Sequence, residues 1–175
     1  RRWSAAKRPV VLAGVGVRLG NAQHELLALA EKMETPIQAT WIGADLIARD
    51  HELYAGRPGA FASRAANFTI QNSDFVLALG ARFDFATTGF SRERFAREAF
   101  RVAVDCDPAE IAKLQGVVEL GVVSDAGELI RALSAQIEHP PESSRLTDWH
   151  AKIADWFRRY PIVTDEMRNI QNRFD

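Results

Sequence analysis

Five short apolar segments place the strongest constraint on how this chain can fold. The most apolar is 74–79, Asp-Phe-Val-Leu-Ala-Leu, and 9–13 and 100–105 are similar. Two weaker candidates occupy 37–41 and 117–123. A strand that is apolar along nearly its whole length, rather than at alternate positions, is typical of a parallel sheet with both faces covered. These segments therefore predict the strands of a buried parallel sheet.

The stretches between these segments favour helices. Residues 21–34 place leucines, Ala30 and Met33 at helical spacing, with Asn21 as the expected N-cap. Strands that alternate with helices predict a doubly wound α/β fold, with a mostly parallel sheet and helices on both faces (Rossmann-like, DHS-like). Such folds bind ligands beyond the carboxyl ends of their strands. The other expected helices are 62–71, 108–114, one capped by Ser124 and Asp125, and 145–159.

The composition argues against several classes of protein. The chain has 22 lysines and arginines against 23 aspartates and glutamates, so its net charge of -1 does not favour binding to nucleic acid or to an anionic membrane. No apolar run approaches the roughly 18 residues of a membrane span. The single cysteine, Cys106, cannot form an internal disulfide, which suits a cytoplasmic protein, and we expect it to be a buried small hydrophobe.

The turn Gly14-Val15-Gly16 stands where the first strand gives way to a helix. Glycines at such a position allow a tight turn and a close approach by a phosphate group, which N–H groups at the start of the helix can bind. The full dinucleotide fingerprint is missing, because Leu19 occupies the third glycine position and Thr40-Trp41 stand where an acidic residue is needed. A nicotinamide dehydrogenase is therefore a poor fit, whereas nucleotide binding and a purely structural turn both stay open.

A second glycine turn, Gly80-Ala81-Arg82-Phe83-Asp84, follows the most apolar strand. An arginine at the ligand-binding end of a strand can pair with a phosphate or stack on a planar ring. The alternative is an ion pair between Arg82 and Asp84, or another nearby residue, that stiffens the loop.

Asp105 and Asp107 flank Cys106 at the end of the next strand. Pro108 indicates that this strand has ended by Asp107, so we expect Asp107 to cap the following helix. Asp105 is then expected to accept a hydrogen bond from a ligand or a backbone N–H. The four histidines have no metal-binding spacing and no nucleophile motif occurs, so we predict neither a metal site nor a catalytic residue.

Taken together, these motifs resemble the central domain of thiamine-diphosphate enzymes, above all that of the acetolactate synthase large subunit. Residues 8–17 are similar to its first strand and glycine turn, 72–84 to its most recognisable stretch, and 104–111 to its next strand and helix start. Ser124-Asp125 stands where the family usually has Gly-Asp, and Phe85-Ala86 replaces an Asp-Arg pair. The resemblance covers residues 7–138.

The resemblance implies a parent enzyme of three domains that acts on 2-oxo acids. The first domain would supply a catalytic glutamate, and the third would bind thiamine diphosphate and Mg²⁺ through a Gly-Asp-Gly motif. This sequence contains no Gly-Asp dipeptide. We therefore expect that cofactor site to lie elsewhere in the parent, and this chain not to be catalytic by itself.

For the central domain, the resemblance implies FAD in a structural role, whereas relatives bind ADP, a CoA moiety or nothing. An assembly domain with a vestigial pocket, or a self-standing nucleotide-binding protein, are the alternatives. Matching the FAD-contacting motifs of the synthases gives ten expected cofactor-binding residues. They are Gly14, Val15, Gly16, Thr40, Gly80, Ala81, Arg82, Asp84, Asp105 and Asp125.

Two parts are expected along the chain. Residues 1–138 would form the central α/β domain, and 139–175 a linker and a helix leading to an absent C-terminal domain. A first residue other than Met also indicates a fragment. The expected partners are the missing N- and C-terminal domains of the same chain, in a parent that assembles as a homodimer or homotetramer.

Overall fold

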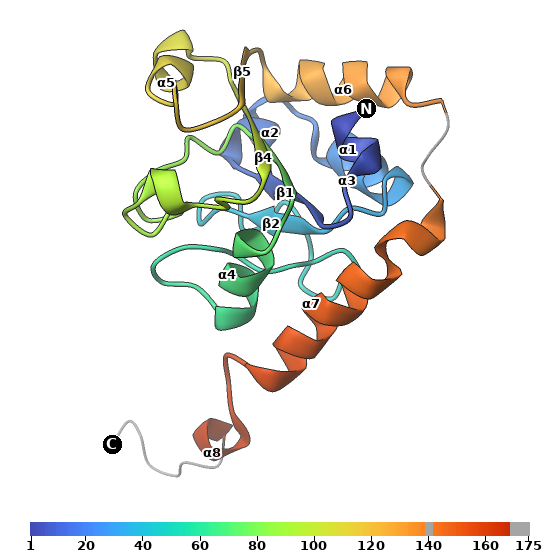
Figure 1. The fold of residues 1–175 in the computed structure, drawn as a ribbon, viewed down its shortest axis with the longest axis vertical. Helices are drawn as coiled ribbons and strands as arrows, with labels where there is room; N and C mark the ends of the chain where they lie inside the picture. The colour runs from blue at the N-terminus through green and yellow to red at the C-terminus, as the bar shows by residue number, and fades with distance from the viewer. Residues whose placement is uncertain (139–141, 169–175) are drawn as a thin grey trace.

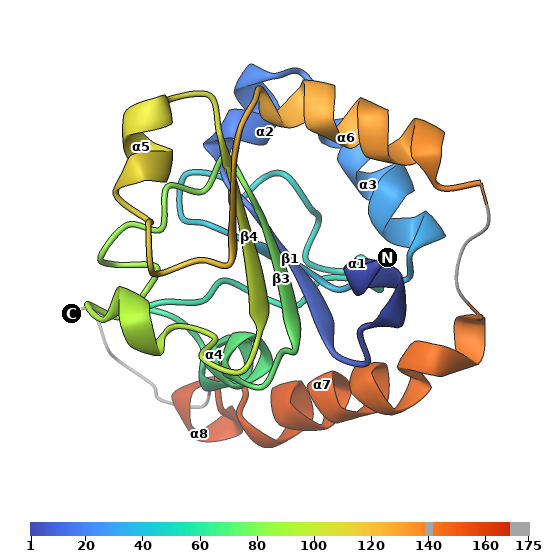
Figure 2. The same cartoon turned by 45° about the horizontal axis from the view of Figure 1, so that its top comes forward.

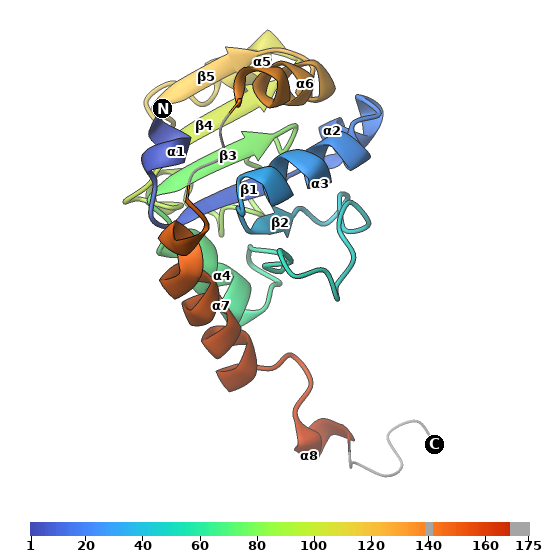
Figure 3. The ribbon, with the colours of Figure 1, turned by 90° about the vertical axis from the view of Figure 1, so that its right-hand side faces the viewer.

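A five-stranded parallel sheet forms the centre of the computed structural model, which describes residues 1–138 and 142–168. The strand order is β2-β1-β3-β4-β5, and every neighbouring pair is parallel. Figure 3 shows the strands side by side with helices on either side of them. The doubly wound α/β fold predicted from the apolar segments is confirmed. The strands are β1 (Pro9–Ala13), β2 (Ile37–Ala39), β3 (Phe75–Leu79), β4 (Phe100–Asp105) and β5 (Leu120–Val123).

Two apolar clusters cover the two faces of the sheet. Alternate residues of each central strand enter opposite clusters, as Val11 and Leu12 of β1 do. One cluster lies under α1 (Arg2–Ala5), α2 (Val15–Leu19), α3 (Gln23–Lys32) and α6 (Ala126–Gln136). The other lies under α4 (Arg64–Gln71), α5 (Pro108–Ala112) and α7 (Thr147–Arg159). Figure 2 shows α3 and α6 on one side of the strands and α4 and α7 on the other.

Three helices begin at the polar residues that helix N-termini favour, because a side-chain oxygen there can accept from an otherwise unpaired backbone N–H. Ser63 Oγ accepts from the N–H of Ala66 at 3.1 Å at the start of α4. Asp107 caps α5 as predicted, and Pro108 occupies the first turn. Asp125 caps α6, again as predicted. The described residues also form 3₁₀ turns at Arg92–Arg94 and Ser143–Leu146, and a short helix, α8 (Asp165–Arg168).

Several local predictions were wrong. The expected helix 21–34 is the shorter α3, and a separate helix, α2, precedes it. Asn21 lies between the two with a φ of 47° instead of capping α3, whose N-cap is Ala22. A tight turn after α2 needs a left-handed residue, a conformation that asparagine tolerates better than most. Cys106 is exposed rather than buried, because the chain turns outward after β4. β2 and β5 are shorter than the apolar runs that predicted them.

Helix α7 packs on the body of the fold. Its Trp149 is 2% exposed and donates from Nε1 to the carbonyl of Pro9 in β1 at 3.1 Å, while Ile153 is buried beside it. Just before α7, the guanidinium of Arg145 hydrogen-bonds the carbonyls of Trp3 and Ala6. The predicted amphipathic helix is confirmed, and of its aromatic residues Trp149 is buried while Trp156 and Phe157 are half-buried against the domain. In Figure 1, α8 lies beyond the end of α7, away from the sheet.

The outer edge of the sheet at β2 is covered by the segment 53–56. Ile37 donates to the carbonyl of Leu53 and accepts from the N–H of Ala55, both at 2.8 Å. The segment thus extends the sheet by a short parallel pairing. Across residues 1–138 and 142–168, no helix has both the length and the apolar character to cross a membrane.

Candidate functional site

The strand order reverses direction between β1 and β3, and the two glycine turns lie at that point, after the carboxyl ends of these strands. Ligands bind at such a switch point in open α/β sheets. The two turns are in direct backbone contact. A Cβ on Gly14 would lie 2.0 Å from the carbonyl oxygen of Gly80, and one on Gly16 would lie 2.7 Å from Gly80 Cα. Gly80 also has a φ of +55°. The glycines are therefore required for the two turns to pack together.

Two of the backbone N–H groups of this turn, those of the glycines, already have partners within the fold. Gly14 donates to the carbonyl of Leu79 at 2.9 Å, and Gly16 donates to that of Gly80 at 3.3 Å. Helix α2, which begins at Val15, has only five residues. A phosphate at this turn would find two of the expected donors already used. The structural interpretation of Gly14-Val15-Gly16 is thus the one that the geometry favours.

Arg82 is the exposed positive charge of the predicted set. It has a φ of 57° and a side chain that is 64% exposed. Its Nη2 pairs with Glu110 Oε1 at 2.9 Å, and not with Asp84. The hydrogen bond and charge of Glu110 raise the pKa of Arg82, with smaller contributions from Asp105 and Asp107. The expected nearby ion pair exists, and it leaves most of the guanidinium open to solvent.

The three predicted carboxylates each accept hydrogen bonds from their own loop. Asp84 accepts from the N–H and Oγ1 of Thr87 at 2.8 and 3.1 Å. Asp105 accepts from the N–H of Asp107 at 3.0 Å. Asp125 accepts from the N–H groups of Gly127 and Glu128 at 2.8 and 3.0 Å. These side chains thus have local structural roles.

Thr40 and Ala81, the two remaining predicted residues besides Val15, are both buried, and Thr40 donates its N–H to Ala13 at the end of β1. The structure brings Thr40 and both glycine turns to the carboxyl ends of three neighbouring strands. Asp105 lies one strand further along, and Asp125 lies beside Gly20 at the start of α6. The ten residues therefore follow one edge of the sheet and do not converge on one point.

Exposed aromatic side chains in the loops that follow β2 and β3 were missed by the sequence reasoning. Trp41 is 57% exposed and Phe61 73%, and their rings meet edge to face at 6.2 Å. Phe85 and Phe90 are exposed in the loop after β3, where the guanidinium of Arg92 lies 4.6 Å from the Phe85 ring centroid. We call Trp41, Phe61, Phe85 and Phe90 the aromatic edge. Large exposed apolar groups at one end of a sheet are typical of a binding surface.

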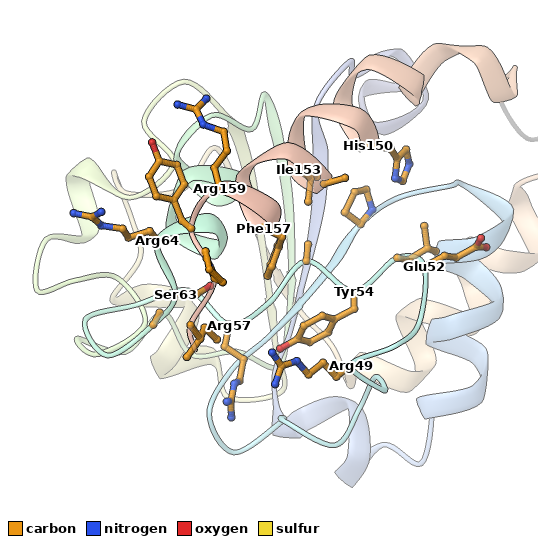
Figure 4. Close-up of a pocket in the computed structure, with 18 of the residues that line it drawn as sticks. Arg49, Glu52, Tyr54, Arg57, Ser63, Arg64, His150, Ile153, Phe157 and Arg159 are labelled. Atoms are coloured by element: carbon orange, nitrogen blue, oxygen red, sulfur yellow. The ribbon is translucent and has the colours of Figure 1, made fainter. Parts of the chain in front are cut away.

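A groove of about 1300 Å³ runs beside β2, between the segment 49–64 and helix α7 with the residues that follow it. We call it the α7 groove. Figure 4 shows Ile153 and Phe157 of α7 facing the segment that carries Tyr54, with arginines around them. No motif marks this groove, because its residues come from separate stretches of the sequence. Only the folded chain brings the irregular loop 43–59 under α7.

Comparison with protein families and with known proteins shows which family the chain resembles. Residues 2–133 match the family described as "Thiamine pyrophosphate enzyme, central domain". The acetolactate synthase large subunit of Corynebacterium glutamicum is 35% identical over 162 residues, covering 92% of this chain and 26% of that protein. The probable large subunit of Methanocaldococcus jannaschii is 39% identical over 132 residues, 75% of this chain and 22% of that protein.

The large subunit of Cyanidium caldarium is 31% identical over 160 residues, 90% of this chain and 27% of that protein. The chain thus spans about a quarter of the length of the relatives it matches. The family match runs from α1 through most of α6 and includes every strand of the sheet. This chain belongs to the family of thiamine pyrophosphate enzyme central domains.

Proposed function

We propose that this chain is the non-catalytic central domain of a thiamine-diphosphate enzyme that acts on 2-oxo acids, of the acetolactate synthase type. The family match over residues 2–133 is the observation that carries the proposal. The names of the relatives support the type of enzyme. In this proposal the thiamine diphosphate and Mg²⁺ are bound by other domains of the parent.

We further propose that the domain contributes a binding site for FAD or another adenine nucleotide at its carboxyl edge. The residues there fit such a ligand in part. Gly14 and Gly16 do not fit a phosphate, because their N–H groups are already paired and the space beside their Cα atoms is filled by Gly80. Arg82 fits a phosphate, since its guanidinium is mostly exposed and holds a positive charge.

The aromatic edge fits the planar ring system of such a nucleotide. Trp41 and Phe61 present rings from one side of the switch point, and Phe85 presents another from the loop after β3. Aromatic faces stack on planar rings and bury large areas when they do. In the proposed complex, Arg82 holds the phosphates and the aromatic edge holds the ring, and the bound nucleotide supplies structural support.

Isothermal titration calorimetry of the chain with FAD, ADP and CoA tests this site. We expect heat with at least one of them, and Arg82→Ala should weaken that binding about tenfold or more, because a hydrogen bond to a charged group is lost. Arg97→Ala removes a comparably exposed arginine, which pairs with Glu98, and should change nothing. An absorbance band of bound flavin in the purified protein would single out FAD.

A second candidate function is assembly alone, without a nucleotide. It is favoured by the use of Asp84 and Asp125 as local caps and by the paired glycine N–H groups. No heat with any of the three nucleotides would favour this candidate over the first. A third, a self-standing nucleotide-binding protein, is tested by the encoding gene, since a reading frame of only this length would contradict a three-domain parent.

A further inference from the structure

The α7 groove has the size and lining of a site for a polypeptide. Its volume of about 1300 Å³ exceeds the ~300–1,000 Å³ that is common for pockets that hold small molecules. Its walls include Leu53, Ala55 and Ile153, which are 5%, 0% and 7% exposed, and the half-buried ring of Phe157. It meets the aromatic edge at Phe61 but is lined by none of the ten expected cofactor-binding residues.

The charge of this groove is opposite in sign to that of the whole chain. Four arginines, Arg49, Arg57, Arg64 and Arg159, line it, against the carboxylates of Glu34 and Glu52, while the chain as a whole has a net charge of -1. Within the described ranges, Arg49, Arg57 and Arg64 form no ion pair with a carboxylate. Only Arg159 does, with Asp155 at 3.4 Å. The groove is therefore a local region of uncompensated positive charge.

The arginines are spread along the groove. Figure 4 shows Arg64 and Arg159 to the left of and above Phe157, and Arg49 and Arg57 below it, near Tyr54. The guanidinium groups of Arg64 and Arg159 lie 5.6 and 5.5 Å from the ring centroid of Tyr160, within the range of a cation–π contact. A single small anion needs donors that converge on one point, whereas separated donors match carboxylates spaced along an extended chain.

From this geometry we propose that the α7 groove binds an acidic segment of a separate polypeptide. An apolar side chain of that segment contacts the floor formed by the half-buried ring of Phe157 and the exposed edge of Ile153. Glutamates or aspartates on either side of it pair with Arg57 and Arg64. The apolar floor supplies burial, and the arginines supply the selection for negative charge.

Fluorescence anisotropy with the 175-residue chain tests this proposal. The probe is a short fluorescein-labelled peptide of alternating glutamate and leucine, and the comparison peptide has lysine in place of glutamate. The acidic peptide should bind and the basic one should not. Added salt should weaken the binding, because both partners are exposed charges. Inorganic phosphate at the same concentration as the peptide should not displace it.

The double variant Arg57→Glu/Arg64→Glu should weaken binding of the acidic peptide about tenfold or more, since two attractive pairs become repulsive. The matched control is Arg94→Glu/Arg97→Glu, which makes the same change in net charge at exposed arginines outside the groove and should leave the affinity unchanged. The milder Arg57→Gln/Arg64→Gln should give an intermediate loss, with far-UV circular dichroism reporting the fold of each variant.

Three results would overturn the proposal. The first is equal binding of the acidic and basic peptides. The second is an equal loss of affinity in the groove and control variants, which would indicate attraction to the overall charge alone. The third is displacement of the peptide by inorganic phosphate, which would indicate a small-anion site. None of these depends on whether a nucleotide binds at the carboxyl edge.

Discussion

The glycine turns at the β1–β3 switch point and the α7 groove use their polar groups in opposite ways. At the switch point, the N–H groups of Gly14 and Gly16 and the carboxylate of Asp84 all have partners in the same loops. In the groove, Arg57 and Arg64 face solvent and form no ion pair with any carboxylate of the residues that the structure describes. The glycine turns, which have the clearest sequence motif, use their polar groups to hold the fold together. The α7 groove, which has no motif, has exposed arginines that a partner could bind.

This difference shows what a short motif can and cannot report. A Gly-x-Gly turn after a strand is compatible with a phosphate, but it is equally compatible with a neighbouring backbone at the same distance. The sequence does not say which of them fills the space. Here Gly80 fills it. The following variants test both halves of the comparison through the free energy of unfolding, measured by urea denaturation with far-UV circular dichroism.

The largest effect is expected for Trp149→Ala, which tests whether the helix that forms one wall of the α7 groove belongs to the folded domain. Trp149 is 2% exposed and hydrogen-bonded to the carbonyl of Pro9. Its removal should lower the free energy of unfolding by about 3–5 kcal/mol, the usual cost of truncating a buried tryptophan. Trp41→Ala, at a ring that is 57% exposed, is the control and should cost far less. Equal losses would mean that α7 is only loosely attached.

The next effect is expected for Gly14→Ala at the switch point. The added methyl group would lie 2.0 Å from the carbonyl oxygen of Gly80 and 2.5 Å from Ala81 Cα, so the backbone must move. We expect a loss of about 3 kcal/mol, at the upper end for overpacking. Gly89→Ala is the matched control, because its φ of +62° carries a backbone penalty but nothing lies within 4 Å of the new atom. It should cost about 1 kcal/mol. If the two variants lost the same amount, the contact between the turns would not exist.

The layers of the fold could be predicted from the sequence because strand and helix periodicity are local properties. The segments 9–13, 74–79 and 100–105 each became a strand, and Ser124-Asp125 preceded a helix as expected. The wrong predictions lie where contacts between distant residues, or tight turns, determine the local conformation. Asn21 could have capped a helix, but the short helix α2 before it forces a left-handed residue there.

The candidate site was less predictable than the fold. The position of both glycine turns at the ends of β1 and β3 followed from the alternation of strands and helices, and the structure places them there. The sequence did not predict which residue pairs with Arg82. Glu110 is 28 residues away along the chain and reaches Arg82 only because α5 packs beside it. The α7 groove was not predictable at all, since it depends on α7 returning to β2 and on the course of an irregular loop.

A smaller effect is expected for Asp125→Ala. This variant tests whether the carboxylate of Asp125 stabilises the fold or binds a ligand. Asp125 caps α6 through two hydrogen bonds, from Gly127 and Glu128. Its loss should lower the free energy of unfolding by about 1 kcal/mol, the usual cost of an N-cap. Asp50→Ala, at an exposed loop position, should cost less. An unchanged stability together with weakened nucleotide binding would instead assign Asp125 to the ligand.

The smallest effect is a pH dependence at Glu110, the residue that holds Arg82 at the carboxyl edge. Hydrogen bonds from Lys113 and Arg82, at 2.6 and 2.9 Å, lower the pKa of Glu110. Because its pKa is lower in the folded state than in the unfolded one, Glu110 stabilises the fold above the ordinary carboxyl pKa, and this contribution is lost as the pH falls through the folded value.

The stability difference between the original chain and Glu110→Gln should therefore be present at about pH 7 and shrink towards about pH 3. It should be smaller than the effect of Asp125→Ala, because the side chains of Arg82 and Lys113 are 64% and 51% exposed and water screens the pairs. Glu98→Gln, which removes the carboxylate of an exposed pair with Arg97, is the control and should cost less at about pH 7. A difference at Glu110 that grew on acidification would mean that this carboxyl is destabilised in its site, and Arg82 would then lack the partner that holds it at the edge.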